Sequence, residues 1–248
     1  MFDPSLPIRD WCVLKGGYAL ELRFHEARST RDLDFSVRGG SDWFEDGDRI
    51  TALRERLQSA AFLRLPDFFT FIVGEAMLAL DQAPEGGARF PVDARVDGRT
   101  FVTFHVDLGV GDEVLDPLDE LAGEDWLGFA GIGPSVAPAL SPEQHWAEKL
   151  HAYTLPRSGA ANSRVRDLID LVFLIERARL SRARVRAALQ ATFERRKTHP
   201  LPGRISMLPP ADWEKPFAAL AHECSLTETP ETAHQRVQAF YLSLRLGS

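Results

Sequence analysis

Two aspartates one residue apart, Asp32 and Asp34, lie in the segment "RSTRDLDFSV", which otherwise has the composition of a buried strand. Side chains alternate between the two faces of a strand, so both carboxylates are expected on the same face. Like charges this close need a cation or a hydrogen-bond network to offset their repulsion. A third acid, Asp107, lies within a later apolar run, "TFVTFHVDLGV". These three residues are the candidate metal ligands.

Such a set of residues supports the transfer of a phosphate-containing group. Three carboxylates supply the hard oxygen ligands that Mg²⁺ prefers, and the ion keeps positions for substrate phosphates. Two ions about 4 Å apart activate an attacking oxygen and stabilise a departing pyrophosphate. The pair Gly16-Gly17 precedes a helical segment, where exposed backbone N–H groups suit an anion. The pattern predicts nucleotidyl transfer from a nucleoside triphosphate (NTP), with Mg²⁺ or Mn²⁺.

Each candidate also has an ordinary structural interpretation. Asp32 and Asp34 alternatively serve as capping residues or as ion-pair partners of Arg28 and Arg31, and Asp107 as an acid at a strand end. His105 shares the face of Asp107, and we expect it to be hydrogen-bonded rather than a metal ligand. The hydroxyls of Ser29 and Thr30 remain open to two interpretations, a phosphate contact or a role in the turn.

The elements expected around these residues divide the chain into two halves. The first half alternates strands and helices: strands at 11–16, 32–37, 68–74, 75–80, 88–96 and 100–110, and helices at 18–27 and from about 49 to 63. The second half is helical, at 141–155, 165–178, 181–199 and 232–244. The predicted fold class is α+β, a mixed sheet with flanking helices followed by a helical domain. Residues 1–127 form the expected catalytic domain, 128–140 a Gly- and Pro-rich linker, and 141–248 the helical domain.

Composition is that of a globular protein. The 248 residues are 44% hydrophobic and 26% charged. The absence of an apolar run of roughly 18 residues and of a secretory signal, with only two cysteines, favours a cytoplasmic protein without a membrane segment.

The charge is unevenly distributed. Residues 157–204 contain twelve Lys or Arg and four acids, a net of +8, which leaves −15 for the rest of a chain whose total is −7. Two interpretations are open, a solvated Arg-rich helix face or a footprint for a polyanion such as RNA.

Four segments in this order resemble the AbiEii/AbiGii toxin family, within the DNA polymerase-β-like nucleotidyltransferase superfamily. They are "LKGGYALELRF…RSTRDLDF", "FHVDLGVGD", "AEKLHAY" and "RVRDLIDL". The family consists of nucleotidyltransferase toxins of type IV toxin–antitoxin and phage-defence systems. Two features depart from the superfamily pattern: fourteen residues separate Gly17 from Asp32, and Tyr18 stands where many relatives have a small hydroxyl residue.

The resemblance implies a role for each candidate residue. Asp32, Asp34 and Asp107 would bind metal, and Gly16 and Gly17 would line the triphosphate. Lys149 would contact nucleotide phosphates, where a flexible point charge is useful. Asp167 and Asp170 would complete the site from the helical half, although both alternatively pair with Arg164 and Arg166 along their helix. The remaining nucleotide-binding candidates are Lys15, Arg28, Ser29 and Thr30.

The expected activity is transfer of a nucleoside monophosphate to RNA, with tRNA as the leading acceptor and growth arrest as the outcome. Alternatives are modification of a small molecule such as an antibiotic, modification of a protein hydroxyl, or a non-catalytic role through a partner. A cognate antitoxin is expected, but a stable complex with it is not implied.

Overall fold

The computed structural model describes residues 8–25, 27–28, 30–38, 49–63, 67–80, 83–156, 164–206 and 208–246. The chain divides into two compact units. The first comprises Met1–Arg23 and Thr30–Leu140, and the second comprises Phe24–Ser29 and Ser141–Ser248. The second unit therefore includes a short segment from the N-terminal part of the chain as well as the C-terminal helices.

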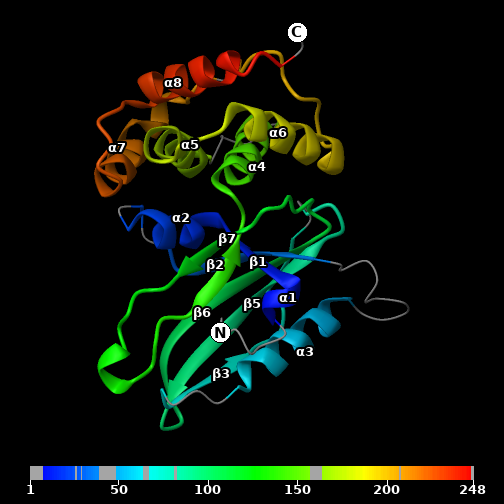
Figure 1. Cartoon of the computed structure of the whole chain (residues 1–248), viewed down its shortest axis with the longest axis vertical. Coiled ribbons are helices and arrows are strands. Elements are labelled where there is room, and N and C mark those ends of the chain that lie inside the picture. The colour runs from blue at the N-terminus through cyan, green and yellow to red at the C-terminus, as the bar shows by residue number, and fades with distance from the viewer. Residues whose placement is uncertain are drawn as a thin grey trace. The chain divides into compact units, whose positions relative to one another are not determined.

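The first unit is built on a mixed sheet, in which the described residues form eight strands (Figure 1). The order is β3-β5-β6-β2-β1-β8-β7, and β4 pairs with β5. The pairs β2–β6 and β1–β8 are parallel, and the other pairs are antiparallel. The strands are β1 Cys12–Lys15, β2 Asp32–Val37, β3 Phe69–Val73, β4 Leu78–Ala79, β5 Gly87–Val96, β6 Arg99–Val110, β7 Asp119–Ala122 and β8 Val136–Ala139.

Helices and apolar side chains hold this sheet. The helices are α1 Ile8–Trp11, α2 Gly16–Phe24 and α3 Arg49–Ala61, with a 3-10 turn at Gly128–Ala130. Leu53 and Leu57 of α3 lie four residues apart on one helix face, and both are buried in a core that includes Phe35, Phe90 and Leu108. The core secures β2, β5 and β6, which are the strands that carry the candidate site.

The second unit is helical. Its helices are α4 Pro142–Thr154, α5 Val165–Arg177, α6 Arg182–Arg196, α7 Glu214–Glu223 and α8 Pro230–Ser243, with a 3-10 turn at Ala211–Trp213. Ser141 caps α4 by accepting a hydrogen bond from the Gln144 N–H, and Pro142 occupies the first turn. Phe24, from the N-terminal segment, packs edge-to-face on Phe173 of α5 with ring centroids 5.3 Å apart. None of the helices described is long and apolar enough to cross a membrane.

The predicted α+β class is confirmed, with differences in detail. The strand predicted at 32–37 is β2 and the helix predicted from Arg49 is α3. The segment 75–80 forms only the two-residue strand β4. Neither β7 nor α7 was predicted, and part of the segment predicted as a linker, 128–140, supplies β8. Such short strands, one with a proline in it, depend on their partners in the sheet and have little local pattern of their own.

Candidate active site

A row of four charged residues crosses four adjacent strands of the sheet. Arg89 on β5 is the register partner of Asp107 on β6, and Asp107 is also the register partner of Asp34 on β2. Asp34 in turn pairs with Lys15 on β1. Directly opposed residues in neighbouring strands point to the same face of a sheet. The predicted neighbourhood of Asp34 and Asp107 therefore exists at the level of the backbone, with a cationic residue on either side.

Arg89 joins two of the candidate metal ligands. Its Nε and Nη2 each donate to a carboxylate oxygen of Asp107 at 2.7 Å, and Nη2 lies 3.5 Å from Oδ2 of Asp32. These hydrogen bonds and the nearby carboxylate charges raise the pKa of Arg89, so the guanidinium is permanently charged. Asp32 therefore has an arginine as ion-pair partner, as its structural interpretation expects, but this arginine is Arg89 rather than Arg28.

His105 stands directly opposite Asp32 across the β2–β6 pair. Its Nδ1 lies 3.1 Å from Oδ1 of Asp32, within hydrogen-bonding distance. The expectation that His105 is hydrogen-bonded is confirmed. One carboxylate oxygen of Asp32 therefore contacts an imidazole and the other faces the Arg89 guanidinium.

The glycine turn lies against Asp34. Gly16 has φ +68°, in the left-handed region, and a Cβ built on it would lie 1.9 Å from Oδ2 of Asp34. Only glycine allows the start of α2 to approach this carboxylate so closely. The next residue, Gly17, is buried. The structure brings together the predicted phosphate-binding turn and the second candidate metal ligand.

Lys15 ends β1 immediately before this turn. Its Nζ bonds to Oδ2 of Asp112 at 2.7 Å, and the Asp112 side chain is only 3% exposed. Lys15 is thereby held at the edge of the row by a carboxylate just beyond β6. Sequence reasoning had not identified Asp112 as its partner.

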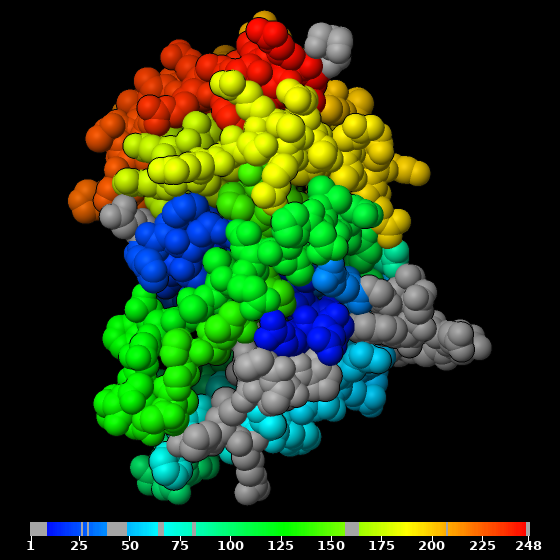
Figure 2. Space-filling model, in the orientation of Figure 1, coloured from blue at the N-terminus to red at the C-terminus, as the bar shows by residue number. Residues whose placement is uncertain are grey.

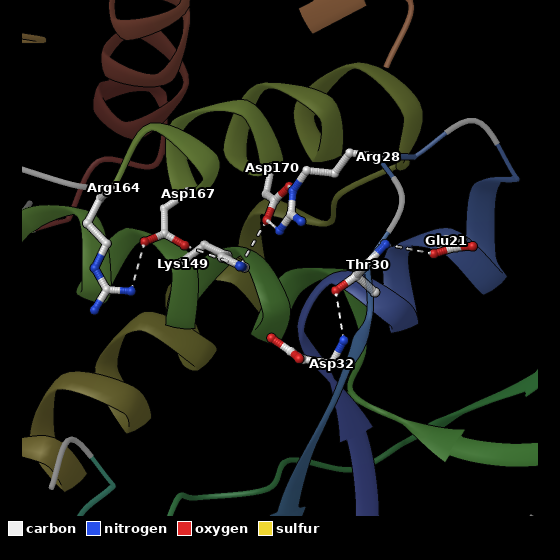
Figure 3. Close-up of polar contacts among 8 residues, drawn as sticks. All are labelled: Glu21, Arg28, Thr30, Asp32, Lys149, Arg164, Asp167 and Asp170. Carbon is white, nitrogen blue, oxygen red and sulfur yellow. Dashed lines mark hydrogen bonds and ion pairs between the residues drawn. The ribbon is translucent and has the colours of Figure 1, made fainter. Parts of the chain in front are cut away.

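The candidates in the second unit form one ion-pair cluster (Figure 3). Lys149 Nζ on α4 lies 2.9 Å from Asp170 and 3.2 Å from Asp167, both on α5. Arg28 forms a two-pronged contact with Asp170, in which its Nε and Nη2 each donate at 3.0 Å. Arg164 lies 3.4 Å from Asp167 one helical turn away. The Lys149 helix and the Asp167 helix therefore meet, and the alternative pairing of Asp167 with Arg164 is present.

The charged groups of this cluster shift one another's pKa values, because they lie close together and are buried. Burial alone would raise the pKa of Asp170, but the charges of Lys149 and Arg28 outweigh it and lower this pKa to about 2. Burial likewise opposes the charge on Lys149, yet Asp170 and Asp167 raise its pKa above the ordinary value. Asp170 is therefore an ionised carboxylate held between two cations, a state suited to orienting Lys149 and unsuited to accepting a proton.

The remaining candidates, Arg28, Ser29 and Thr30, lie just before β2, where the chain passes from the second unit to the first. Arg28 is buried against Asp170 in the second unit. The Thr30 N–H donates to Oε2 of Glu21 at 3.3 Å, and Oγ1 of Thr30 accepts from the Asp32 N–H at 3.5 Å, so Thr30 shapes the start of β2 (Figure 3). Ser29 lies outside the described residues, so its two interpretations stay open.

Comparison with known proteins gives the family. The family model described as "Nucleotidyl transferase AbiEii toxin, Type IV TA system" matches residues 2–241, nearly the whole chain. The chain belongs to the AbiEii family. It is thus placed among the nucleotidyltransferase toxins of type IV toxin–antitoxin systems, which implies an NTP as substrate and a cognate antitoxin. No curated protein matches the chain by sequence.

A solved structure agrees with this membership at the level of the fold. The chain is similar to MenT4, a nucleotidyltransferase toxin of Mycobacterium tuberculosis H37Rv, with a TM-score of 0.52 and 18% sequence identity. The alignment covers 95% of this chain and 85% of MenT4. At this identity the likeness shows a shared fold, and it does not transfer residue roles.

The donor set of this AbiEii protein fits a divalent ion in the type of its ligands. Asp32, Asp34 and Asp107 are oxygen donors on one face of two adjacent parallel strands, and a cationic group already bridges Asp107 and Asp32. As the side chains stand, no three His, Cys, Asp or Glu residues within the described ranges are gathered tightly enough to hold a metal ion. The Arg89 guanidinium stands between two of the carboxylates that would have to gather.

Sequence reasoning missed two arginine contacts in this protein. Arg89 lies in a strand of ordinary alternation, and only the β5–β6 register places it opposite Asp107. Arg28 was assigned to nucleotide binding, and its contact with Asp170, 142 residues away, has no local pattern. A search for Arg at alternating positions on the strands beside Asp107 would have included Arg89 among its candidates.

Proposed function

We propose that this protein is a Mg²⁺-dependent toxin that transfers a nucleoside monophosphate from an NTP to an RNA acceptor. Asp32, Asp34 and Asp107 are the proposed metal ligands. The observation that carries the proposal is the direct pairing of Asp34 with Asp107 across two parallel strands, with Asp32 on the same face. Family membership supports the reaction class, and the register supports the choice of these carboxylates.

Magnesium bound there would neutralise the triphosphate and polarise its phosphorus–oxygen bonds. The acceptor hydroxyl oxygen would form a bond to the α-phosphorus and release its proton to solvent, while the bond between the α-phosphorus and the departing pyrophosphate breaks. The backbone N–H groups at the start of α2 bind phosphate oxygens, since the left-handed Gly16 brings this turn against Asp34. The triphosphate would then lie beside the carboxylate row.

Lys149, Asp167 and Asp170 remain in the proposal with distinct roles. An ammonium group has three N–H donors, and contacts to Asp167 and Asp170 occupy two of them. The third is then available for a nucleotide phosphate. Asp170 acts as a positioning residue for Lys149, because both of its oxygens already bind cations.

Exposed arginines favour an RNA acceptor. Three arginines of the basic window contact their own unit: Arg184 lies 3.6 Å from Glu143, Arg196 lies 3.6 Å from Glu148, and Arg186 donates to the Leu244 carbonyl oxygen. Others are exposed, and α6, in yellow, lies at the surface (Figure 2). Among these exposed basic residues are Arg166, Arg179, Arg182, Lys197 and Arg204. Pairing of such residues with phosphates would bind RNA through its backbone. We take tRNA as the leading acceptor and growth arrest as the consequence of its modification.

A labelling experiment tests the proposal. The purified protein is incubated with each α-labelled NTP and Mg²⁺, separately with total RNA, tRNA, a panel of antibiotics and a protein extract. Label is expected in RNA, and label in antibiotic or protein instead would identify a different acceptor. Asp34→Asn should abolish transfer, whereas Asp93→Asn, on β5 and ion-paired with Arg95, should not. Equal transfer by wild type and Asp34→Asn would refute the assigned site.

A growth experiment addresses the toxic outcome. Induced expression of the wild type is expected to arrest growth, and Asp34→Ala should relieve the arrest at equal protein level. Undiminished arrest by Asp34→Ala would mean that toxicity does not depend on the proposed chemistry.

A further inference from the structure

We infer that Arg89 is a built-in cation that occupies the divalent-ion position in the metal-free protein and leaves when Mg²⁺ binds. This rests on the proposed function, because it concerns the same three carboxylates. Neither the pattern of the sequence nor the family description assigns Arg89 a role.

The first argument is charge balance along the row. Asp34 and Asp107 are neighbours on adjacent strands, and Asp32 shares their face two residues away, so three negative charges lie together on one face of the sheet. Without a cation such a group is unfavourable, since neighbouring like charges disfavour ionisation. Lys15, at one end of the row, lies 2.7 Å from Asp112. Arg89 supplies the neutralising charge at the other end.

The second argument is the position of the guanidinium. It binds both oxygens of Asp107 at 2.7 Å and approaches Asp32 to 3.5 Å, so it bridges two of the proposed ligands. A metal ion bridging the same two carboxylates would occupy the space of the guanidinium and would be repelled by its positive charge. Arg89 and a divalent ion therefore compete for Asp107 and Asp32, and one has to release them before the other binds.

The third argument is that Arg89 has a route out. Its side chain is 32% exposed, whereas the Asp107 side chain is 13% exposed. A long side chain at the surface can swing toward solvent by rotation about its own bonds, while the carboxylate stays fixed in the strand. The displaced cation would remain near the carboxylate row, where a triphosphate could then pair with it.

Metal binding in the absence of NTP tests this inference. Binding of Mn²⁺ to the purified, chelator-treated protein is followed by the loss of the electron paramagnetic resonance signal of free Mn²⁺. Arg89→Gln should bind Mn²⁺ about tenfold more tightly than wild type, equivalent to about 1.4 kcal/mol. The matched control is Arg95→Gln, an arginine of similar exposure on the same strand that pairs with Asp93 and lies outside the row. It should bind Mn²⁺ as wild type does.

Thermal unfolding gives a second readout. In chelator, Arg89→Gln should melt below wild type because its carboxylates have lost their cation, and saturating Mg²⁺ should raise its melting temperature more than that of wild type. If Arg89→Gln does not fold, Arg89→Lys serves instead, since an ammonium cannot form the two-pronged contact and should give an intermediate Mn²⁺ affinity.

The outcomes separate this inference from the proposed function. Equal or weaker Mn²⁺ binding by Arg89→Gln, with clear binding by wild type that is lost in Asp34→Asn, overturns the role of Arg89 and leaves the metal site intact. No Mn²⁺ binding by wild type or by either Arg89 variant overturns both the inference and the proposed metal ligands.

Discussion

Substituting Gly16 by alanine tests the contact between the glycine turn and Asp34. Two costs are expected. The left-handed backbone at φ +68° penalises any residue with a Cβ by about 1–2 kcal/mol. The new methyl would also lie 1.9 Å from Oδ2 and 2.8 Å from Cβ of Asp34, so the overlap involves the base of that side chain and not only its tip. Forcing such an overlap costs a further 1–3 kcal/mol or so.

Gly98 provides the matched control. It lies in the β5–β6 turn with φ +73°, and a Cβ added there meets nothing within 4 Å. Gly98→Ala thus carries the backbone cost alone, about 1–2 kcal/mol, while Gly16→Ala should lose about 2–5 kcal/mol of unfolding free energy. The difference between the two variants measures the displacement of Asp34 by the methyl group.

The assays are denaturant unfolding and nucleotide transfer. Because the two units need not unfold together, the transition is followed by probes in each unit and not by a single global signal. A shift of Asp34 by about 1 Å should lower transfer roughly 100-fold in Gly16→Ala, with little change in Gly98→Ala. If the two variants are equally stable and equally active, Gly16 does not hold Asp34 and the reasoning fails.

Three further predictions concern the second unit. In the folded state the pKa of Asp170 is lowered from 3.8 to about 2. Its contribution of about 2 kcal/mol to the free energy of unfolding is therefore present above pH 4 and is lost as the pH falls toward 2. Asp170→Asn should make the free energy of unfolding less dependent on pH in this range. Arg28→Met should destabilise the unit by about 3 kcal/mol, because it removes a buried partner of Asp170. Arg184→Met should cost less, because the Arg184 side chain is 46% exposed and lies 3.6 Å from its partner Glu143. Replacing Arg179 and Arg182 together by Gln should make the plot of log affinity for RNA against log salt less steep, by the equivalent of about one to two phosphate contacts.

Each of these has a clear contrary result. An unchanged pH profile in Asp170→Asn would mean that the cluster is not the source of acid sensitivity. Equal losses in Arg28→Met and Arg184→Met would remove the distinction between a buried and a half-exposed arginine. An unaltered salt slope in the Arg179 and Arg182 variant would place the RNA surface elsewhere.

Much of the fold was predictable because it is encoded locally. The alternation of Leu33, Phe35 and Val37 with polar neighbours predicted β2, and the spacing of Leu53 and Leu57 predicted α3. The strands β7 and β8 were missed, since four-residue strands among Gly and Pro carry little local pattern, and β8 is held by β1 and β7.

The pairing of Arg89 with Asp107 depends on a β-bulge. Near the turn, Val96 pairs with Arg99 and Arg95 with Thr100, but the next pair is Ala94 with Val102, so Phe101 is skipped. If the register of the first two pairs continued without this extra residue, Arg89 would stand opposite Val106, whose side chain is buried. A slip of one residue exchanges the two faces of a strand. One exposed phenylalanine in the ladder thereby puts a guanidinium among carboxylates.

The sequence by itself determined which chemistry was available: two aspartates on one strand face, a third on a later strand, a glycine turn, and four ordered segments that indicated the family. These follow from residue type and from periods of two and 3.6 residues, which are properties of neighbours in the chain. Only the tertiary structure decided the partners, Arg89 for Asp107 and Arg28 for Asp170. Ion pairs between distant residues depend on register and packing, and these arise from the sum of many contacts along the chain.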